Sequence, residues 1–425
     1  MANPDIAWRQ QGGILRHAGL LFLMRLATSF ASAGLYMIMA RRLGVQSFGG
    51  LASLSAFVFL SQALMDGGTS SVVSRAAANR DHVRSLGVAW RYRAWTASLG
   101  MLVVILYWLV WAYSEPSTRD LKHPLVFTLC VVLALLAATQ TLLSALLIGL
   151  GRTGEGSAIQ LVEKVMAAGW FLWLSSMSPT ILIGLLSLTL GCLASCAYGM
   201  WLVRRQFGRT YLLSVKIHRQ DVRQAFHFMI TTLGGQLQNF DVPLVGLLAG
   251  AGAAGLLAGP SRLTAPLGMV AATAATIVFV QARHSSGISG GSGRSGLTLI
   301  GGGILVITAL GVSPLLIAPD ATARFLLGDQ FQSAGGVFRL FAVAVCVGSI
   351  NQLLAAHLQA RGHEAEVAKG VVLGGALGLV VVGLTARPFG AIGGGFGVLA
   401  AQAIILSSLL LFYRKTLNRK SEYGD

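Results

Sequence analysis

The sequence predicts an all-α polytopic membrane protein with about twelve transmembrane helices in two six-helix lobes. The chain of 425 residues is 54% hydrophobic and 11% charged, with a mean hydropathy of +0.70. Soluble globular domains carry about 25% charged residues. Apolar runs of about 20 residues, long enough to cross a bilayer as helices, follow one another along the chain. A turn sequence near residue 44 also recurs near residue 250, which favours two related halves.

The first lobe is expected to hold six spans. A polar, arginine-rich connector follows the second span, and a basic connector after the sixth span marks the boundary between the lobes. The expected domains are therefore residues 1–206 and 207–425. The six spans are residues 16–40, 47–65, 92–113, 124–150, 157–176 and 180–203, and the two connectors are residues 67–91 and 204–223.

The second lobe is expected to repeat this arrangement with six further spans. A loop rich in Gly and Ser (residues 283–294) precedes its third span, and a short amphipathic segment (residues 319–332) follows that span. The polar tail after residue 413 is too hydrophilic to enter the bilayer. The six spans are residues 225–248, 254–281, 296–318, 335–360, 366–385 and 391–413.

Two sequence matches at nearly the same offset indicate an internal duplication. The first match has an offset of 206 residues, the separation of Gly44 and Gly250, and the second has an offset of 211 residues, the separation of Gly151 and Gly362. Weak internal symmetry of this kind is typical of transporters. The first match also pairs Gly49 with Gly255, Leu51 with Leu257 and Ala52 with Ala258.

The basic residues set the orientation of the chain. Positively charged residues in short loops stay on the cytoplasmic side. Most Arg and Lys residues fall on one side when the N-terminus is placed in the cytoplasm, so both termini are expected there. This placement explains most of the net charge of +17 and makes nucleic acid an unexpected partner. The sequence has no short apolar run followed by a cleavage site, so no signal peptide is expected.

Sequence motifs of enzymes and cofactor sites are missing. The glycine-rich segment 149–156 lacks the lysine of a phosphate-binding loop, and no metalloprotease helix or nucleophile elbow appears. The cysteines lie in apolar runs without an accompanying His or carboxylate, which favours buried structural roles. We therefore expect a protein that is not an enzyme and has no metal or cofactor. The cysteines are Cys130, Cys192, Cys196 and Cys346.

The hairpin formed by residues 236–262 carries the charges of greatest interest. Asp241 and Arg262 each lie about two helical turns from a Gly/Ala turn at residues 249–254. Ionisable residues at that depth usually face a partner or a wet cavity. Asp241 is therefore a candidate for ion coupling, or else a structural ion-pair partner of Arg262. Further polar candidates for a cavity are Gln236, Gln238, Asn239 and Asn351, the last with helix–helix hydrogen bonding as its alternative.

Three arginines within spans are candidates to bind an anionic head group. Arg25, Arg262 and Arg339 outnumber the single charge of Asp241, so the interior is expected to attract a phosphate or diphosphate. Arg339 lies near a helix end and could instead extend to the interface. Glu163 and Lys164 are expected at the cytoplasmic interface.

Four segments resemble the polysaccharide-export branch of the MOP superfamily, the Wzx-type O-antigen flippases for lipid-linked oligosaccharides. The segment ARRLGVQSFG resembles the family's stretch after its first helix, and DGGTSS resembles the turn after its second. The hairpin from Asp241 onward resembles the seventh and eighth helices. The last segment, FLLGDQFQSA, resembles the stretch before the tenth helix. These segments begin at Ala40, Asp66, Asp241 and Phe325.

The resemblance implies a fold like that of MATE transporters, with two six-helix bundles facing a central cavity and alternating access. The implied function is to flip an undecaprenyl-diphosphate-linked oligosaccharide from the cytoplasmic to the periplasmic leaflet of the bacterial inner membrane. The implied partners are that lipid-linked oligosaccharide, the bilayer and a polysaccharide polymerase. Two alternatives remain open, namely a cation-coupled multidrug exporter of the same superfamily and a non-transporting scaffold for a polysaccharide synthase.

Overall fold

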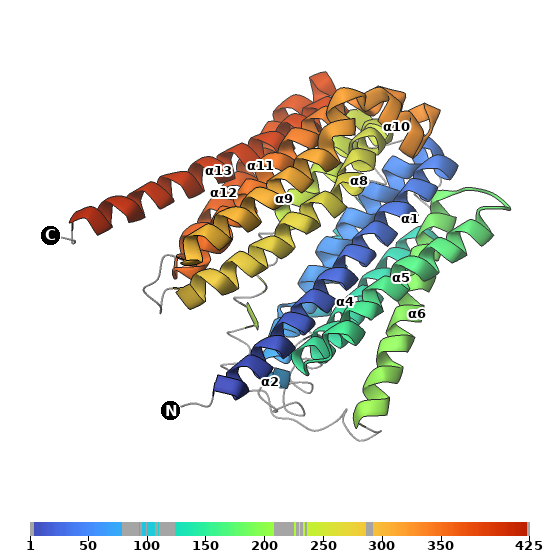
Figure 1. Ribbon diagram of the computed structural model, residues 1–425. Coiled ribbons are helices and arrows are strands. Elements are labelled where there is room, and N and C mark those ends of the chain that lie inside the picture. The colour runs from blue at the N-terminus through green and yellow to red at the C-terminus, as the bar shows by residue number, and fades with distance from the viewer. Residues whose placement is uncertain are drawn as a thin grey trace. The chain divides into compact units, whose positions relative to one another are not determined.

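The computed structural model describes residues 4–78, 93, 96–98, 100–106, 109, 124–207, 225–226, 229, 233, 236–285 and 292–422. Helices make up nearly all of these residues, which contain no strand (Figure 1). Seven of the described helices are long and apolar enough to cross a membrane, or eight if one bent pair is a single span. The predicted class, an all-α polytopic membrane protein, is thereby confirmed. The number of spans, twelve, stays a prediction, because residues 92–113 and 225–235 lie largely outside the described residues.

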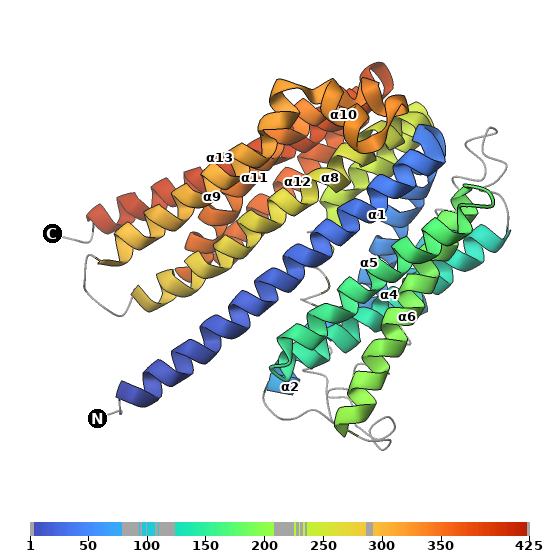
Figure 2. The same cartoon turned by 45° about the vertical axis from the view of Figure 1, so that its right-hand side comes forward.

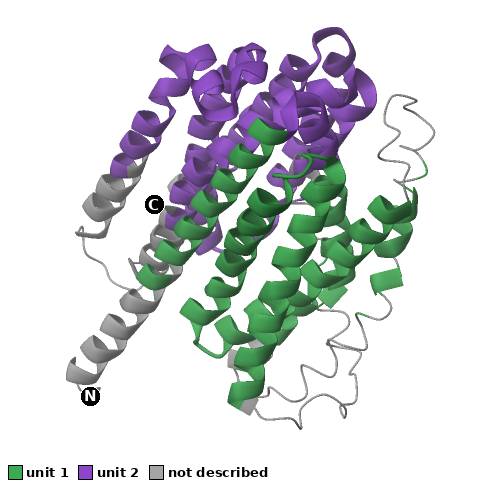
Figure 3. Ribbon diagram, turned by 90° about the vertical axis from the view of Figure 1, so that its right-hand side faces the viewer, with its two compact units in different colours: residues 1–42, 54–233 green, residues 43–53, 234–425 purple. Residues whose placement is uncertain are grey.

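The chain forms two compact units, shown in green and purple in Figure 3. Unit 1 contains Met1–Arg42 and Leu54–Leu233, and unit 2 contains Leu43–Ser53 and Gly234–Asp425. The assignment of Leu43–Ser53 to unit 2 is a feature that the sequence did not reveal. The lobe limits of 1–206 and 207–425 stay a prediction.

Unit 1 contains a packed helix that we did not expect, α2. The connector at residues 67–91 was predicted to be polar, but its first part forms helix α2, whose Val73 and Ala77 pack against Leu142 and Leu146 of α4. The prediction was wrong for this part because the apolar residues of α2 lie on one buried face, hidden in the sequence among Ser and Arg. The longer described helices of unit 1 are α1 (Pro4–Asp66, apart from its residues 43–53), α2 (Thr69–Ala78), α4 (Pro124–Gly149), α5 (Thr153–Leu174) and α6 (Ile181–Phe207).

The described residues of unit 2 from 236 onward form six helices and two short 3₁₀ helices, and the α1 segment Leu43–Ser53 joins them. Helix α10 bends by 96° from the end of α9, and these two helices are the bent pair counted above. Helices α12 and α13 run side by side in Figures 1 and 2. The elements are η2 (Leu237–Phe240), α8 (Asp241–Ser285), α9 (Ser292–Ile317), α10 (Pro319–Leu327), η3 (Asp329–Ala334), α11 (Gly335–Ala360), α12 (Glu364–Phe389) and α13 (Ala391–Glu422).

The backbone confirms the internal repeat at both predicted matches. Gly44 interrupts α1 with φ 75° and ψ 171°, and Gly250 interrupts α8 with φ 87° and ψ 166°. Gly151 and Gly362 also share a positive φ, of 79° and 86°. Glycine adopts this conformation without the steric cost that a side chain imposes. The break in α8 is confined to Gly250, so the turn predicted over residues 249–254 was too long.

The repeated segments contact each other within unit 2 through equivalent residues. A methyl group on Gly49 would lie 1.8 Å from the carbonyl oxygen of Ala251, and one on Gly255 would lie 2.1 Å from that of Val45. Val45 and Ala251 are themselves related by the offset of 206 residues, so the contact is reciprocal, as across a two-fold axis. The aromatic rings of Phe48 and Phe331 also pack edge to face, with 5.9 Å between their centroids. These contacts explain why Leu43–Ser53 belongs to unit 2.

Candidate functional site

Asp241 is the buried carboxylate of unit 2. It is the first residue of α8, directly after η2, and only 6% of its surface is exposed. The backbone N–H of Val242 donates a hydrogen bond of 2.8 Å to Asp241 Oδ1. The N-terminus of a helix stabilises a negative charge through its free N–H groups and its dipole. The local backbone therefore favours a charged group at this position, although burial in an apolar bundle opposes it.

A small cavity of about 30 Å³ lies next to Asp241. The other walls come from α12 and α13, which approach each other closely because glycines line their contact. A methyl group on Gly397 would lie 2.1 Å from Val382 Cγ2, and one on Gly378 would lie 2.6 Å from Ala401 Cβ. A volume of this size holds a water molecule or a small ion. The walls are Asp241, Gly375, Gly378, Leu379, Val382, Gly397, Val398, Ala401 and Gln402.

A pair of side-chain amides joins α11 to the cavity. Asn351 Nδ2 donates hydrogen bonds of 2.9 Å to the backbone oxygen of Gln402 and of 3.0 Å to its Oε1. Asn351 is 4% exposed, and its Oδ1 has no hydrogen-bond partner among the described residues. The structure thus connects two predicted residues, Asp241 and Asn351, through Gln402. Gln402 was not predicted, although a lone amide in an otherwise apolar span was a usable signal.

The three predicted arginines occupy different surroundings. Arg262, in α8, is partly buried, and its charge acts on Asp241. Asp241 and Arg262 do not form an ion pair with each other within 4.0 Å. Arg339 is exposed on α11 in unit 2, and Arg25 is exposed on α1 in unit 1.

The polar residues before Asp241 form a local contact. Asn239 Nδ2 donates a hydrogen bond of 2.6 Å to Gln236 Oε1, and both residues flank or belong to η2. Asn239 is exposed, so this amide pair points away from the buried part of unit 2. The side chain of Gln238 lies outside the described residues.

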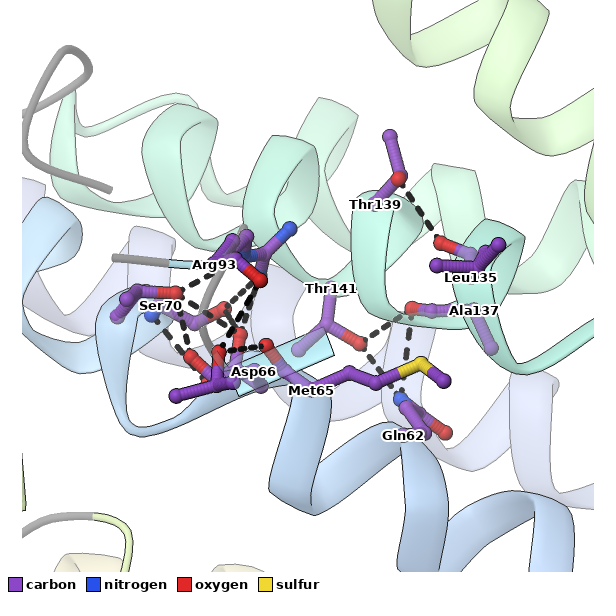
Figure 4. Close-up of polar contacts among 11 residues, drawn as sticks. Gln62, Met65, Asp66, Ser70, Arg93, Leu135, Ala137, Thr139 and Thr141 are labelled. Atoms are coloured by element: carbon purple, nitrogen blue, oxygen red, sulfur yellow. Dashed lines mark hydrogen bonds and ion pairs between the residues drawn. The ribbon is translucent and has the colours of Figure 1, made fainter. Parts of the chain in front are cut away.

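A buried ion pair that sequence reasoning missed closes the end of α1 in unit 1 (Figure 4). The guanidinium group of Arg93 and the hydroxyl of Ser70 both donate hydrogen bonds to Asp66 Oδ1. Arg93 Nε also donates to Thr69 Oγ1 at 2.9 Å. The Arg93 and Asp66 side chains are 8% and 12% exposed. Every member of this cluster is satisfied within it, which indicates that it holds the turn at Gly67 and Gly68 in place.

Glu163 and Lys164 are largely buried within unit 1, and their place at the cytoplasmic interface stays a prediction. Glu163 is ten residues from Thr153, the start of α5, which places it about 15 Å along the helix. The two side chains are 12% and 13% exposed and form an ion pair of 2.6 Å. Helix α5 begins before the expected residue 157, because the glycines read as a link are helical. Unit 1 therefore contains an ion pair in the middle of a helix.

The fold and these buried charges define a class of protein, a polytopic all-α membrane protein with charged groups inside its helical units. The profile of the family described as polysaccharide biosynthesis protein matches residues 14–280, more than half of the chain. The chain belongs to this family. Among curated proteins, no sequence matches it significantly.

Solved structures of MOP transporters share the fold at low sequence identity. The lipid II flippase MurJ in an inward closed conformation is 16% identical, with a TM-score of 0.71 over 92% of this chain and 87% of its own. An inward-facing multidrug resistance MATE transporter is 12% identical, with a TM-score of 0.61 over 95% and 96%. A MOP transporter from Pyrococcus furiosus is 11% identical, with a TM-score of 0.59 over 96% and 95%. At these identities the likeness concerns the fold alone.

Proposed function

We propose that this protein flips a lipid-linked oligosaccharide, carried on undecaprenyl diphosphate, from the cytoplasmic to the periplasmic leaflet of the bacterial inner membrane. Membership of the polysaccharide biosynthesis family carries this proposal. The similarity to a flippase for another lipid-linked substrate, lipid II, supports it. The product would be consumed by a polysaccharide polymerase on the periplasmic side, with both termini of the flippase in the cytoplasm.

In this proposal the head group is bound by cations. Arg25, Arg262 and Arg339 would contact the diphosphate and sugars in a cationic cavity during alternating access, while the lipid tail stays in the bilayer. Guanidinium groups bind phosphate oxygens in a bidentate way and keep their charge at every physiological pH. The exposure of Arg25 and Arg339 supports their assignment, since a buried guanidinium could not reach a substrate.

Ion coupling is assigned to Asp241. Its carboxylate borders a cavity large enough for one water-sized occupant, and Gln402 supplies an amide at the same cavity. The charge of Arg262 acts on the same carboxylate. A proton or a monovalent cation bound at Asp241 would therefore change the electrostatic surroundings of a proposed head-group ligand, which is the physical basis for coupling.

A deletion strain tests the proposed function. We expect loss of surface polysaccharide together with accumulation of lipid-linked intermediates on the cytoplasmic side. A plasmid-borne wild-type copy should restore the polymer. A deletion strain with as much surface polysaccharide as the wild type would contradict the proposal.

Alanine variants test the arginine assignment in the same strain. Arg25→Ala and Arg262→Ala should abolish export while the protein still inserts into the membrane. Arg324→Ala is the matched control, because Arg324 is 61% exposed and pairs on the surface with Asp329. Normal surface glycan in both Arg25→Ala and Arg262→Ala would remove the assignment.

A cation-coupled multidrug exporter is a second candidate function. An exporter of this kind needs an acidic residue in its first lobe to bind a cation, and the largely buried Glu163 in the middle of α5 is a carboxylate in unit 1. Unchanged surface polymer with new sensitivity of the deletion strain to cationic dyes would favour the exporter. A third outcome would favour a non-transporting scaffold for a polysaccharide synthase. In that outcome, deletion removes the surface polymer but the arginine variants leave it unchanged.

A further inference from the structure

The carboxylate of Glu163 in unit 1 takes no part in the proposed function, yet it is fully engaged. Lys164 Nζ donates to Glu163 Oε1 at 2.6 Å, and Gln140 Nε2 donates to Oε2 at 2.8 Å. Both carboxylate oxygens therefore have a donor. The ammonium and carboxylate charges cancel, so this three-residue cluster is neutral as described.

Four helices of unit 1 surround the cluster. Helix α4 contributes Gln140, whose Oε1 accepts a contact of 3.6 Å from Cys192 Sγ of α6. Cys196, one turn further along α6, donates to the backbone oxygen of Leu136 at 3.2 Å. Tyr36 of α1 is 3% exposed and acts electrostatically on Lys164. Among the described groups that act on the cluster, only Glu163 and Lys164 carry a full charge at neutral pH.

This arrangement is difficult to explain as a device for stability. An ion pair buried in a low-dielectric interior is often no more stable than apolar residues of the same volume. Glu163 and Lys164 both lie in the predicted span 157–176, and ionisable residues within membrane spans mark ion pathways and proton relays. The side chains of Lys164 and Glu163 also keep 13% and 12% of their exposure, so water can deliver a proton to the carboxylate.

We propose that Glu163, Lys164 and Gln140 form a proton-binding site in unit 1, where a proton on Glu163 releases the ammonium group of Lys164. The carboxylate takes a proton from water and becomes a neutral acid, so it no longer holds Lys164 by charge. The new O–H can donate to Gln140 Oε1, because a side-chain amide both donates and accepts. The cluster changes from neutral to singly positive, and the released ammonium can bind an oxyanion such as a phosphate group.

This inference extends the proposed function, which assigns ion coupling to Asp241 of unit 2 alone. If the protein flips a diphosphate-linked lipid, the site would add one positive charge to unit 1 only when a proton is bound. Proton binding and anion binding at Lys164 would then strengthen each other, because each is more favourable when the other has occurred.

Infrared difference spectroscopy between acidic and alkaline buffers tests the site in the full-length protein, reconstituted in nanodiscs without glycan. A protonated carboxylic acid has a carbonyl band that the carboxylate lacks. We expect wild type to show this band and Glu163→Gln to lose one component of it. Glu155→Gln is the matched control, because Glu155 lies in the first turn of the same helix and pairs with Arg152 at 2.5 Å. It should keep the Glu163 component.

A second variant tests the site from the side of the cation, and its spectra are recorded at a temperature at which the variant is folded. Lys164→Met retains the carboxylate but removes the adjacent cation, so the same band should persist into more alkaline buffer. The expected displacement is about one pH unit or more, a tenfold change in proton affinity. Identical spectra for wild type and Glu163→Gln, or an unmoved band in Lys164→Met, would overturn the proposal. Neither result depends on glycan export, so failure of the proposed function would be seen separately in the deletion strain.

Discussion

Glu163 of unit 1 and Asp241 of unit 2 are both carboxylates buried in apolar helices, but their charges are stabilised in different ways. Glu163 has a neutralising lysine as its immediate neighbour and a glutamine from another helix. Asp241 has the N-terminus of its own helix, one backbone N–H and a small cavity. The first site is a closed set of side chains, whereas the second leaves room for an occupant. We therefore expect substitutions at the first site to affect folding strongly and those at the second to affect transport.

Removal of the cation from the first site should have the largest effect on stability. Lys164→Met leaves Glu163 buried without its counter-charge, and breaking a buried pair in this way costs about 3–5 kcal/mol. The thermal unfolding of the purified variant measures the loss. The loss should shrink in acidic buffer, because a protonated Glu163 has no charge to leave unpaired.

The double variant Glu163→Gln/Lys164→Met is the control for that prediction. Removal of both charges leaves no unpaired ion, so most of the lost stability should return. If Lys164→Met unfolds at the wild-type temperature in neutral buffer, the carboxylate is not held by Lys164 and the contrast with Asp241 is lost.

A smaller loss of stability is expected from substitutions at the contact between the repeated segments. Gly49→Ala and Gly255→Ala would each place a methyl group within about 2 Å of a backbone oxygen of the other segment, and overpacking of this kind costs about 1–3 kcal/mol. Because the contact is reciprocal, the two variants should lose similar stability. Thermal unfolding against Gly252→Ala gives the comparison, since a methyl group on Gly252 meets nothing within 4 Å. Clearly unequal losses of stability in Gly49→Ala and Gly255→Ala would show that the two segments do not contribute equally to the contact.

Much of the fold was predictable because its signals are local. The apolar runs indicate the spans, and the paired glycines Gly44 and Gly250 identify the two backbone breaks, because only glycine adopts that backbone conformation easily. The start of α5 was missed for a related reason. Gly154 and Gly156 read as a link, but Gly156 lies inside α5 and packs closely on α4, since a methyl group there would lie 2.8 Å from the backbone oxygen of Ser144.

The arrangement of the site was not predictable, because it depends on contacts between distant helices. Asp241 was identified from its charge and depth, whereas its connection to Asn351 through Gln402 depends on how α11, α13 and α8 pack. The pair of Arg93 with Asp66 likewise joins residues that are far apart in sequence. A single sequence gives the types of residue in each span but not the register between spans.

The smallest effect on stability is expected at the second site, where the effect on transport should be large. Asp241→Asn keeps the shape of the side chain and its bond from Val242 but removes the charge beside the cavity. Because burial disfavours that charge, its loss should change stability by no more than about 0.5–1 kcal/mol. Export of surface glycan, scored in the deletion strain, should fall by about tenfold or more, which corresponds to about 1.4 kcal/mol. Asp329→Asn is the matched control, because Asp329 is 82% exposed in a surface pair with Arg324 and should leave both readouts unchanged. If Asp241→Asn exports normally but unfolds at a clearly lower temperature, Asp241 is a structural partner of Arg262, and the two carboxylates are alike after all.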